Sequence, residues 1–202
     1  MSETQNLVYN TTALVQDNLK NVKSTPEPVS NPYPLAKDGD IALSIPTKLF
    51  DFTVDDAVEI ASRLIDSAKM LNIYNLTANQ CGLRYRVFVV GVGDDFVGFF
   101  NPTIVEYSAA EILLDEIDVS NPALSLKIKR PKIIYIDYQD YKGEFHNVRF
   151  DGLSARLIQQ SYDRLNGIDF KSKASKLVLD RALKSREKKM KRFVKSMMSY
   201  RK

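Results

Sequence analysis

The sequence has few residues that could bind a metal or carry out redox chemistry. Its 202 residues include one cysteine, Cys81, one histidine, His146, and no tryptophan. A single cysteine excludes an intramolecular disulfide framework and fits a reducing compartment. A zinc site draws three or four ligands mostly from Cys and His, so these two residues cannot form one by themselves. The composition therefore argues against a zinc site, and we expect neither a metal nor another cofactor.

Long apolar segments are also missing. No run approaches the roughly 18 residues that a membrane span needs. The amino terminus, MSETQNLVYN, lacks a basic start followed by an apolar stretch, which argues against a secretory signal. We expect a protein without a membrane span that is cytoplasmic when synthesised. The hydrophobic content of 44% is enough for one domain with a substantial core.

Charge is distributed unevenly along the chain. Residues 171–202 contain thirteen Lys and Arg against two acids, whereas the preceding residues contain sixteen basic and twenty-three acidic side chains. The net charge of +4 therefore comes from a basic tail on an acidic body.

The apolar pattern predicts an α+β fold in three parts. Residues 1–36, with four prolines between positions 26 and 34, favour an extended arm. Residues 37–170 hold the periodic segments of a domain. Residues 171–202 contain no Pro or Gly and predict a basic helix. Within the domain we expect helices from about 53 to 71 and from 152 to Gly167, and strands at 86–92, 95–102, 111–119, 131–140 and 144–150.

Three segments, in order, resemble the signature motifs of the peptide deformylases. Residues Ile73–Gln80 (IYNLTANQ) are similar to the family's G-x-G-L-A-A-x-Q, and Asn121–Ser125 (NPALS) stands where the family has E-G-C-L-S. Residues Gln159–Gly167 (QQSYDRLNG) are similar to Q-H-E-x-D-H-L-x-G. The resemblance covers about residues 40–170 and implies the family's fold, with antiparallel strands around a central helix that bears a motif. It also implies a metalloenzyme that removes the formyl group from the first methionine of new chains.

The residues that would carry this chemistry are replaced. The resemblance implies a metal-binding Cys and two His, with a Glu as general acid and base. The chain has Ala123, Gln160, Arg164 and Ser161 at those positions. Alanine has no donor atom, a glutamine amide is a poor ligand for a transition metal, and arginine stays protonated and repels a cation. We therefore expect no catalytic residue among the degenerate family positions Gln80, Ala123, Leu124, Gln160, Ser161 and Arg164.

The free energy of water activation that is lost with the metal supports this prediction. A bound metal lowers the pKa of its water from about 15.7 to about 7, which corresponds to about 12 kcal/mol at 1.36 kcal/mol per unit. Gln80 resembles the family's oxyanion-stabilising glutamine, but one such donor cannot replace that activation. Cys81 is expected to pack as a small hydrophobic residue, and His146 is expected to be solvated.

Two motif positions leave alternatives open, and a third carries an expectation about the backbone. Gln80 either keeps a role in binding an oxyanion or ties the backbone together as a buried amide. Arg164 either places its guanidinium where the family holds a cation, paired with Asp163 or another acid, or lies solvated on a helix face. Asn75 replaces a glycine, which predicts a turn with positive φ at this residue.

The basic tail has an apolar stripe at helical spacing. The proposed partner-binding residues are four apolar and four basic side chains: Met190, Phe193, Val194, Met197, Lys188, Lys189, Lys191 and Arg192. The stripe either packs on the body of the protein or docks on RNA, an acidic protein surface or a membrane.

Together these patterns predict a deformylase-like protein that is not an enzyme. The first hypothesis is a structural or adaptor protein anchored in a large multi-protein assembly, such as the tail or baseplate of a phage. The second is a pseudoenzyme that binds rRNA on the ribosome through its basic helix. The third is an active deformylase with an unconventional site.

Overall fold

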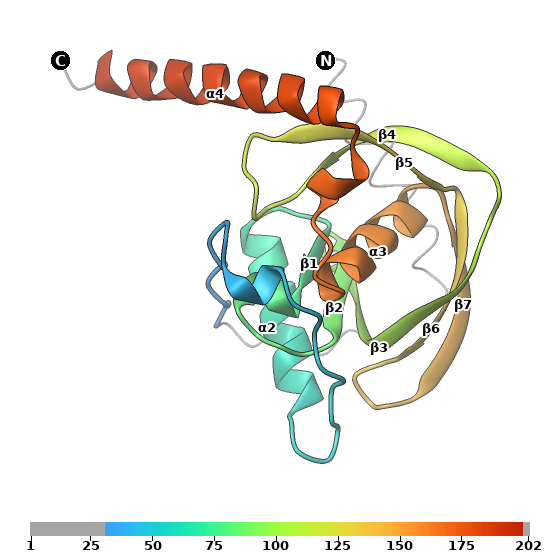
Figure 1. Ribbon diagram of the computed structural model, residues 1–202. Helices are drawn as coiled ribbons and strands as arrows, with labels where there is room; N and C mark the ends of the chain where they lie inside the picture. Colours follow the sequence, from blue (N-terminus) through green and yellow to red (C-terminus); the bar gives the residue numbers. More distant parts are fainter. Residues whose placement is uncertain (1–30, 200–202) are drawn as a thin grey trace.

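In the computed structural model, residues 31–199 form an α+β fold (Figure 1). The expected arm therefore lies largely outside the described residues, and the boundaries at 36 and 170 stay predictions. In chain order the elements are η1 (Ile41–Leu43), α2 (Ala57–Met70), β1 (Asn75–Thr77), η2 (Ala78–Cys81), β2 (Val87–Val92), β3 (Asp95–Tyr107), β4 (Glu111–Ile117), β5 (Ser125–Pro131), β6 (Ile133–Gln139), β7 (Phe145–Asp151), α3 (Gly152–Leu165), η3 (Phe170–Lys173) and α4 (Lys176–Ser199).

Five antiparallel strands form the main sheet, in the order β1-β2-β3-β6-β7. Both faces of β2 are buried, because alternate side chains point to opposite faces of a strand. Phe88 and Val90 join the cluster under α3, whereas Val87 and Val89 join the cluster under α2. This explains why β2 reads as a continuous apolar run, VFVVGV. The two helices thus cover opposite faces of one sheet.

A separate two-stranded sheet of β4 and β5 lies beside α3 (Figure 1). Its Leu126 and Ile128 are buried together with Leu124 and Phe170. The first turns of α4 cover this small cluster through Val178, Leu179 and Ala182. No helix among residues 31–199 combines the length and the apolar character that crossing a membrane requires.

Several local expectations differ from the structure. Helix α2 begins at Ala57 because Asp56 caps it, accepting a hydrogen bond from the Glu59 N–H at 3.0 Å; Asp51 instead accepts from Thr53. Strand β3 continues beyond Pro102, with register shifts that absorb the proline. Strand β5 was not expected.

The glycine expected to end α3 does so. Gly167 adopts φ +73°, and a Cβ there would lie 2.7 Å from the carbonyl oxygen of Ser44. Both the left-handed backbone and the close approach require glycine at this position.

Candidate functional site

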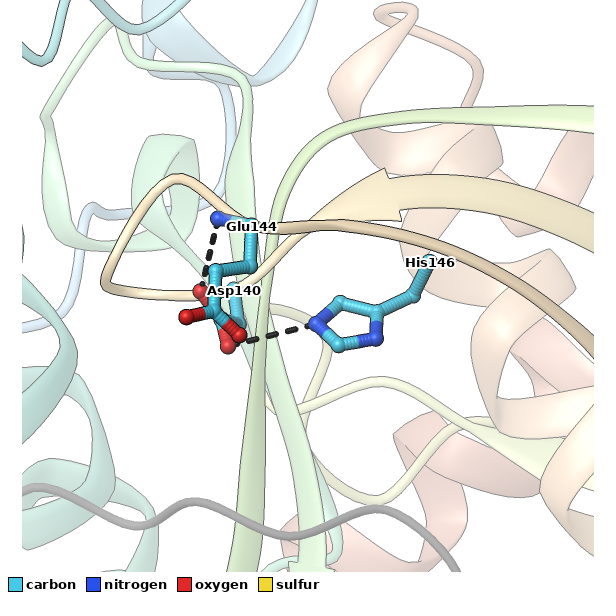
Figure 2. A group of neighbouring side chains, drawn as sticks. All are labelled: Asp140, Glu144 and His146. Atoms are coloured by element: carbon cyan, nitrogen blue, oxygen red, sulfur yellow. Dashed lines mark hydrogen bonds and ion pairs between the residues drawn. The ribbon is translucent and has the colours of Figure 1, made fainter.

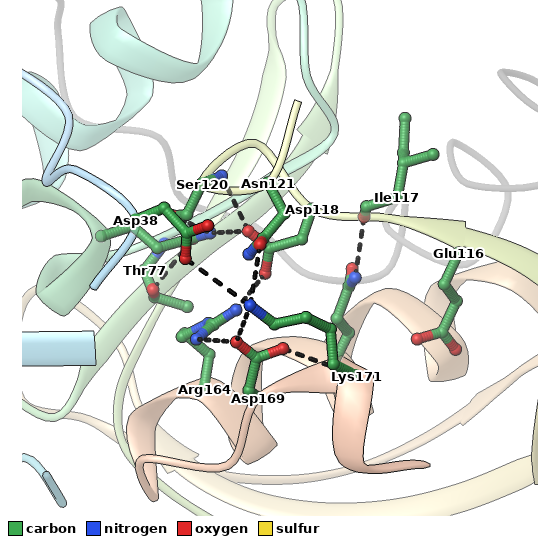
Figure 3. Close-up of polar contacts among 12 residues, drawn as sticks. Asp38, Thr77, Glu116, Ile117, Asp118, Ser120, Asn121, Arg164, Asp169 and Lys171 are labelled. Carbon is green, nitrogen blue, oxygen red and sulfur yellow. Dashed lines mark hydrogen bonds and ion pairs between the residues drawn. The ribbon is translucent and has the colours of Figure 1, made fainter. Parts of the chain in front are cut away.

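The three motif segments meet at one place in the fold. Gln80 lies in η2, Asp118, Ser120 and Asn121 follow β4, and Arg164 lies in the last turn of α3. Figure 3 shows Asp118, Ser120 and Arg164 gathered with Asp169 and Lys171. The order of motifs read from the sequence thus corresponds to a single site, which we call the motif site.

Gln80 lies at the buried end of the motif site, with 4% of its surface exposed. Its Oε1 accepts hydrogen bonds from the N–H and the hydroxyl of Thr77, both at 3.0 Å. Its Nε2 donates to Asp118 Oδ1 at 3.2 Å and to Ser120 Oγ at 3.4 Å. The oxygen is held firmly, whereas both bonds of the amide nitrogen are long.

Arg164 is the only formal positive charge placed directly on a motif position, and it is buried, with 3% exposure. Its Nη2 donates to Asp118 Oδ2 at 2.7 Å, and its Nη1 lies 3.8 Å from Asp169 Oδ2. The partner is therefore Asp118, not the neighbouring Asp163, which pairs with Arg130. A buried guanidinium needs such a carboxylate because an unpaired charge in the interior is costly.

Gln160 and Ser161 are tied to the strands beside α3. The Gln160 Nε2 donates to the carbonyl oxygen of Ile117 at 2.8 Å. The side-chain amide of Asn75 donates to Ser161 Oγ at 2.9 Å and to Gln160 Oε1 at 3.3 Å. Asn75 lies in strand β1, so the turn expected there is wrong. Positive φ among non-glycine residues of the described chain occurs at Asn72, Asn101 and Ala123.

Ala123 and Leu124 do not join the polar network. Ala123 is exposed and adopts φ +63° in the turn before β5. Leu124 is buried in the small cluster beneath η3 and α4. The two residues therefore shape the turn and the core, and neither offers a ligand atom.

These side chains do not fit the transition metal that the family resemblance implies. The groups at the motif positions are a guanidinium, two amides and a hydroxyl, with Asp118 as the carboxylate that binds the guanidinium. A metal ion would meet the positive charge of Arg164, and neutral amides bind such ions weakly. The carboxylate of Asp118 instead neutralises the guanidinium of Arg164 within the site.

Charged residues extend the motif site towards its rim. Lys171 Nζ donates to Asn121 Oδ1 at 3.0 Å and lies 3.2 Å from Asp169 Oδ2 and 3.6 Å from Asp38 Oδ1. Two buried donors, Arg164 Nε and Asn121 Nδ2, have no hydrogen-bond partner among the described residues. The site therefore keeps donor capacity that an acceptor oxygen could use.

A second ionic cluster lies behind the motif site. Glu116 accepts from Arg130 Nε and Nη2, at 2.5 and 3.0 Å, and also from Arg156 Nη1. Although burial lowers the pKa of Arg130, its hydrogen bond and charge interaction with Glu116 raise that pKa above its ordinary value. Burial lowers the pKa of Arg156.

Glu116 and Asp118 were not among the site residues expected from the sequence. They stand two residues apart in EILLDEIDV, which places them on one face of a strand. Arg156, Gln160 and Arg164 recur every four residues, on one face of α3. These two spacings could have predicted the pairing.

The lone cysteine and histidine lie away from the motif site network. Cys81 is buried, and burial raises its pKa to about 12, so its thiol stays protonated and poorly nucleophilic. His146 is partly buried and contacts Asp140 Oδ2 through Nε2 at 3.2 Å, so the expectation of a solvated side chain is wrong.

Asp140, Glu144 and His146 cluster at the β6–β7 turn (Figure 2). Asp140 Oδ1 already accepts from the backbone N–H groups of Lys142 and Glu144, at 2.8 and 3.0 Å. These bonds, with the His146 contact, are those of an aspartate that organises a tight turn.

The predicted partner-binding residues lie on α4, beyond the turns that pack on the body. Phe193 is 60% exposed, and Met190, Val194 and Met197 are also exposed. The side chains of the four basic residues are exposed as well: Lys188, Lys189, Lys191 and Arg192. The alternative that this stripe packs on the body is therefore wrong, because the residues of α4 that pack there are Val178, Leu179 and Ala182.

Comparison with known proteins identifies the relatives of the chain. Residues 32–179 match the family model described as polypeptide deformylase. The peptide deformylase of Thermotoga petrophila is 33% identical over 141 residues, covering 68% of this chain and 84% of that protein. That of Dictyoglomus thermophilum is 32% identical over 158 residues, covering 76% of this chain and 97% of that protein.

Solved structures agree with these sequence relatives. The peptide deformylase of Thermotoga maritima superposes with a TM-score of 0.67 at 30% identity, over 72% of this chain and 99% of that one. The Synechococcus elongatus enzyme, solved in complex with actinonin, gives a TM-score of 0.73 at 25% identity, over 82% of this chain and 92% of that one.

These relatives correct the functional expectation. Their shared name, peptide deformylase, points to an enzyme, so the prediction of a non-catalytic structural or adaptor protein is wrong. The tail, baseplate and pseudoenzyme hypotheses are wrong with it.

The matched residues include all the elements that build the motif site, from η2 to α3. Both the family model and the relatives cover more than half of the chain. The chain therefore belongs to the polypeptide deformylase family.

Proposed function

We propose that the chain takes the substrate class of its relatives, the formylated amino-terminal end of a peptide, in the motif site. We further propose that the family's metal positions in this site are degenerate. One observation carries the proposal: the first and third motif segments meet through Gln80 and Arg164, which share Asp118 and present donors where the resemblance implies an oxyanion donor and a metal ligand.

A formyl peptide offers carbonyl oxygens, which need hydrogen-bond donors. The Gln80 amide nitrogen can turn towards such an oxygen at low cost, because its bonds to Asp118 and Ser120 are 3.2 and 3.4 Å long. Arg164 adds a permanent charge and an unpartnered Nε. These groups can bind and polarise a carbonyl, and they do not activate water as a metal does.

The experiment measures binding, turnover and metal content on one preparation. Calorimetric titration compares a formyl-Met peptide with its acetylated and unblocked forms, release of free amino termini reports turnover, and elemental analysis reports metal. We expect saturable binding that prefers the formyl peptide, with metal well below one atom per chain. Turnover without metal would show that the chain is an enzyme that activates its nucleophile without a metal-bound water. Lack of saturable binding overturns the substrate proposal, and turnover that scales with one bound metal overturns the degenerate site.

A variant of the oxyanion position sharpens this test. Gln80→Met removes the amide donor while nearly keeping its volume, and should weaken formyl-peptide binding by about tenfold, the effect of losing one hydrogen bond. Gln139→Met on β6 is the matched control, because it removes a glutamine outside the motif site. An equal loss of formyl-peptide affinity in the two variants would show that the Gln80 side chain makes no specific contribution to binding.

Three properties stay predictions. The chain is expected to act in the cytoplasm, where newly made peptides arise. Origin in a phage genome is proposed from the basic character of helix α4, and the source of the gene tests it. The residues from Lys188 to Met197 are proposed to contact a partner, with other proteins of an assembly, rRNA or a membrane as the candidates, and purification from the native source tests the first two.

A further inference from the structure

Helix α4 has two halves with different surroundings. Its first turns pack Val178, Leu179 and Ala182 on the cluster of Leu124, Leu126, Ile128 and Phe170. The outer half, residues 186–199, projects past the rest of the fold in Figure 1. Because the inner turns are fixed to the body, the outer half is held out as a rigid extension.

The outer half carries an apolar stripe. With 3.6 residues per turn, Met190, Phe193, Val194 and Met197 fall within an arc of roughly 100°. Their exposed fractions are 45%, 60%, 47% and 54%. A contiguous apolar face of this kind on a charged helix is typical of a contact surface.

The remainder of the outer half is strongly basic. Residues 186–199 contain six Lys or Arg against one acid, Glu187, and Glu187 pairs with Lys191 at 2.6 Å. Lys189 and Lys191 flank the stripe at about 100° to either side of Met190, whereas Lys188, Arg192 and Lys195 lie opposite it. The long Lys stems can therefore lie along an apolar layer while their ammonium groups reach anionic headgroups.

We propose that the outer half of α4 is an interfacial helix that lies on an anionic lipid surface. Such helices combine a basic polar face with Phe and other apolar residues on the opposite face, and they lie in the plane of the membrane without crossing it. Both features of α4 are used by this partner: the stripe enters the boundary of the acyl layer and the basic residues bind headgroups.

Two of the alternative partners, a nucleic acid and a second copy of the chain, use only one of the two features. A nucleic acid backbone would bind the Lys and Arg side chains but leave Phe193 and Met197 in water. A second copy of α4 would bury the stripe but bring two strongly basic helices together, which is unfavourable. Charge complementarity together with the stripe therefore favours an anionic bilayer.

The test uses the full chain and vesicles of phosphatidylcholine with or without phosphatidylglycerol. The chain has no tryptophan, so Phe193→Trp introduces a single reporter within the stripe. We expect sedimentation with the anionic vesicles only, and a blue shift of the tryptophan emission as the indole enters the bilayer. Binding should weaken as salt rises and persist in part, because burial of the stripe is not screened.

Matched variants separate the stripe from the charge. Phe193→Asp with Met197→Asp should reduce vesicle binding at least tenfold. Ser185→Asp with Ser196→Asp adds the same charge to the same helix outside the stripe and should cost clearly less. Circular dichroism checks that all variants keep their helix content.

Several outcomes overturn the proposal. It fails if anionic vesicles do not bind the chain, or if the two Asp pairs reduce binding equally. It also fails if RNA binds more tightly than vesicles without a blue shift at Phe193→Trp, which would assign a nucleic-acid surface. Dimer formation that Phe193→Asp with Met197→Asp abolishes, in the absence of lipid binding, would assign a second copy.

Discussion

The two sides of α3 are built from opposite kinds of contact. Towards the main sheet, Ala155, Ile158 and Leu165 are fully buried in an apolar cluster. Towards β4 and β5, Arg156 and Gln159 donate to backbone carbonyl oxygens of those strands, as Gln160 does to that of Ile117. One helix therefore joins a conventional core to an interface held by hydrogen bonds and ion pairs.

The difference bears on how the buried charges of the motif site are balanced. The polar side of α3 carries the motif positions, and in this chain its charge is balanced by carboxylates of the neighbouring strands, Glu116 and Asp118. A buried ion pair adds little net stability compared with apolar packing, but removing one partner is costly because the other charge stays buried. The polar side should therefore be fragile to single changes and tolerant of paired ones.

The largest effect is expected at Glu116, which serves two arginines. Glu116→Gln keeps the shape but leaves Arg156 without its carboxylate and Arg130 with only Asp163. We expect a loss of about 3–5 kcal/mol in the free energy of unfolding, measured by urea denaturation.

The control for this change lies on the same strand. Glu111→Gln alters an exposed carboxylate of β4 and should shift stability by no more than about 0.5 kcal/mol. Equal effects of the two variants would show that the Glu116 cluster is not a distinct buried unit.

Breaking the Asp118–Arg164 pair should lower the free energy of unfolding slightly less, because Asp169 remains 3.8 Å from Arg164. Asp118→Asn is expected to cost about 3 kcal/mol. The double variant Asp118→Asn with Arg164→Met should recover most of this loss, since no buried charge is then left unpaired. A thermodynamic cycle measures the coupling, and additive losses would contradict the pairing.

The same contrast explains what the sequence could predict. The continuous run of β2, the Gly167 helix end and the order of the motifs follow from local patterns, and the structure agrees with them. Strand β5 was missed although Leu126 and Ile128 alternate with lysines, because its basic residues resemble a loop segment. The start of α2 was misplaced because Asp51, Thr53 and Asp56 all offer a cap, and only the folded chain selects one.

The ionic contacts were harder to predict for a different reason. Glu116, Arg130 and Arg156 come from three elements separated by up to forty residues, and no local pattern states which charges meet. The sequence left open whether Arg164 is solvated or pairs with Asp163 or another acid; the structure pairs it with Asp118, and Asp163 pairs with Arg130 and Lys173. Partner choice is decided by the tertiary arrangement.

On the apolar side of α3, one polar atom breaks the pattern. Tyr138 is 1% exposed in the same cluster, and its hydroxyl has no partner among the described residues. Tyr138→Phe removes this group and should raise stability by about 1 kcal/mol. A loss of that size would instead indicate a hydrogen bond to a bound water.

The pH dependence gives a second readout at Tyr138. Burial, with the charge of Asp140, raises the pKa of Tyr138 above its ordinary value. Below about pH 10 both folded and unfolded chains keep the proton; above it the unfolded chain releases the proton first, so stability falls as pH rises. Tyr138→Phe should make the denaturation midpoint less sensitive to pH in this range.

The smallest effect is expected for an ion pair of the same chemistry in an exposed place. Glu187 and Lys191 lie four residues apart on α4, and the hydrogen bond from Lys191 lowers the pKa of Glu187. Water and salt screen such a pair, and ordering its side chains offsets the attraction. Glu187→Gln should therefore leave the urea midpoint unchanged, whereas the same substitution at Glu116 unfolds the chain at much lower urea. A clear loss of stability at Glu187 would mean that the outer half of α4 is coupled to the folding of the body, and it would then be a part of the core fold and not the rigid extension described above.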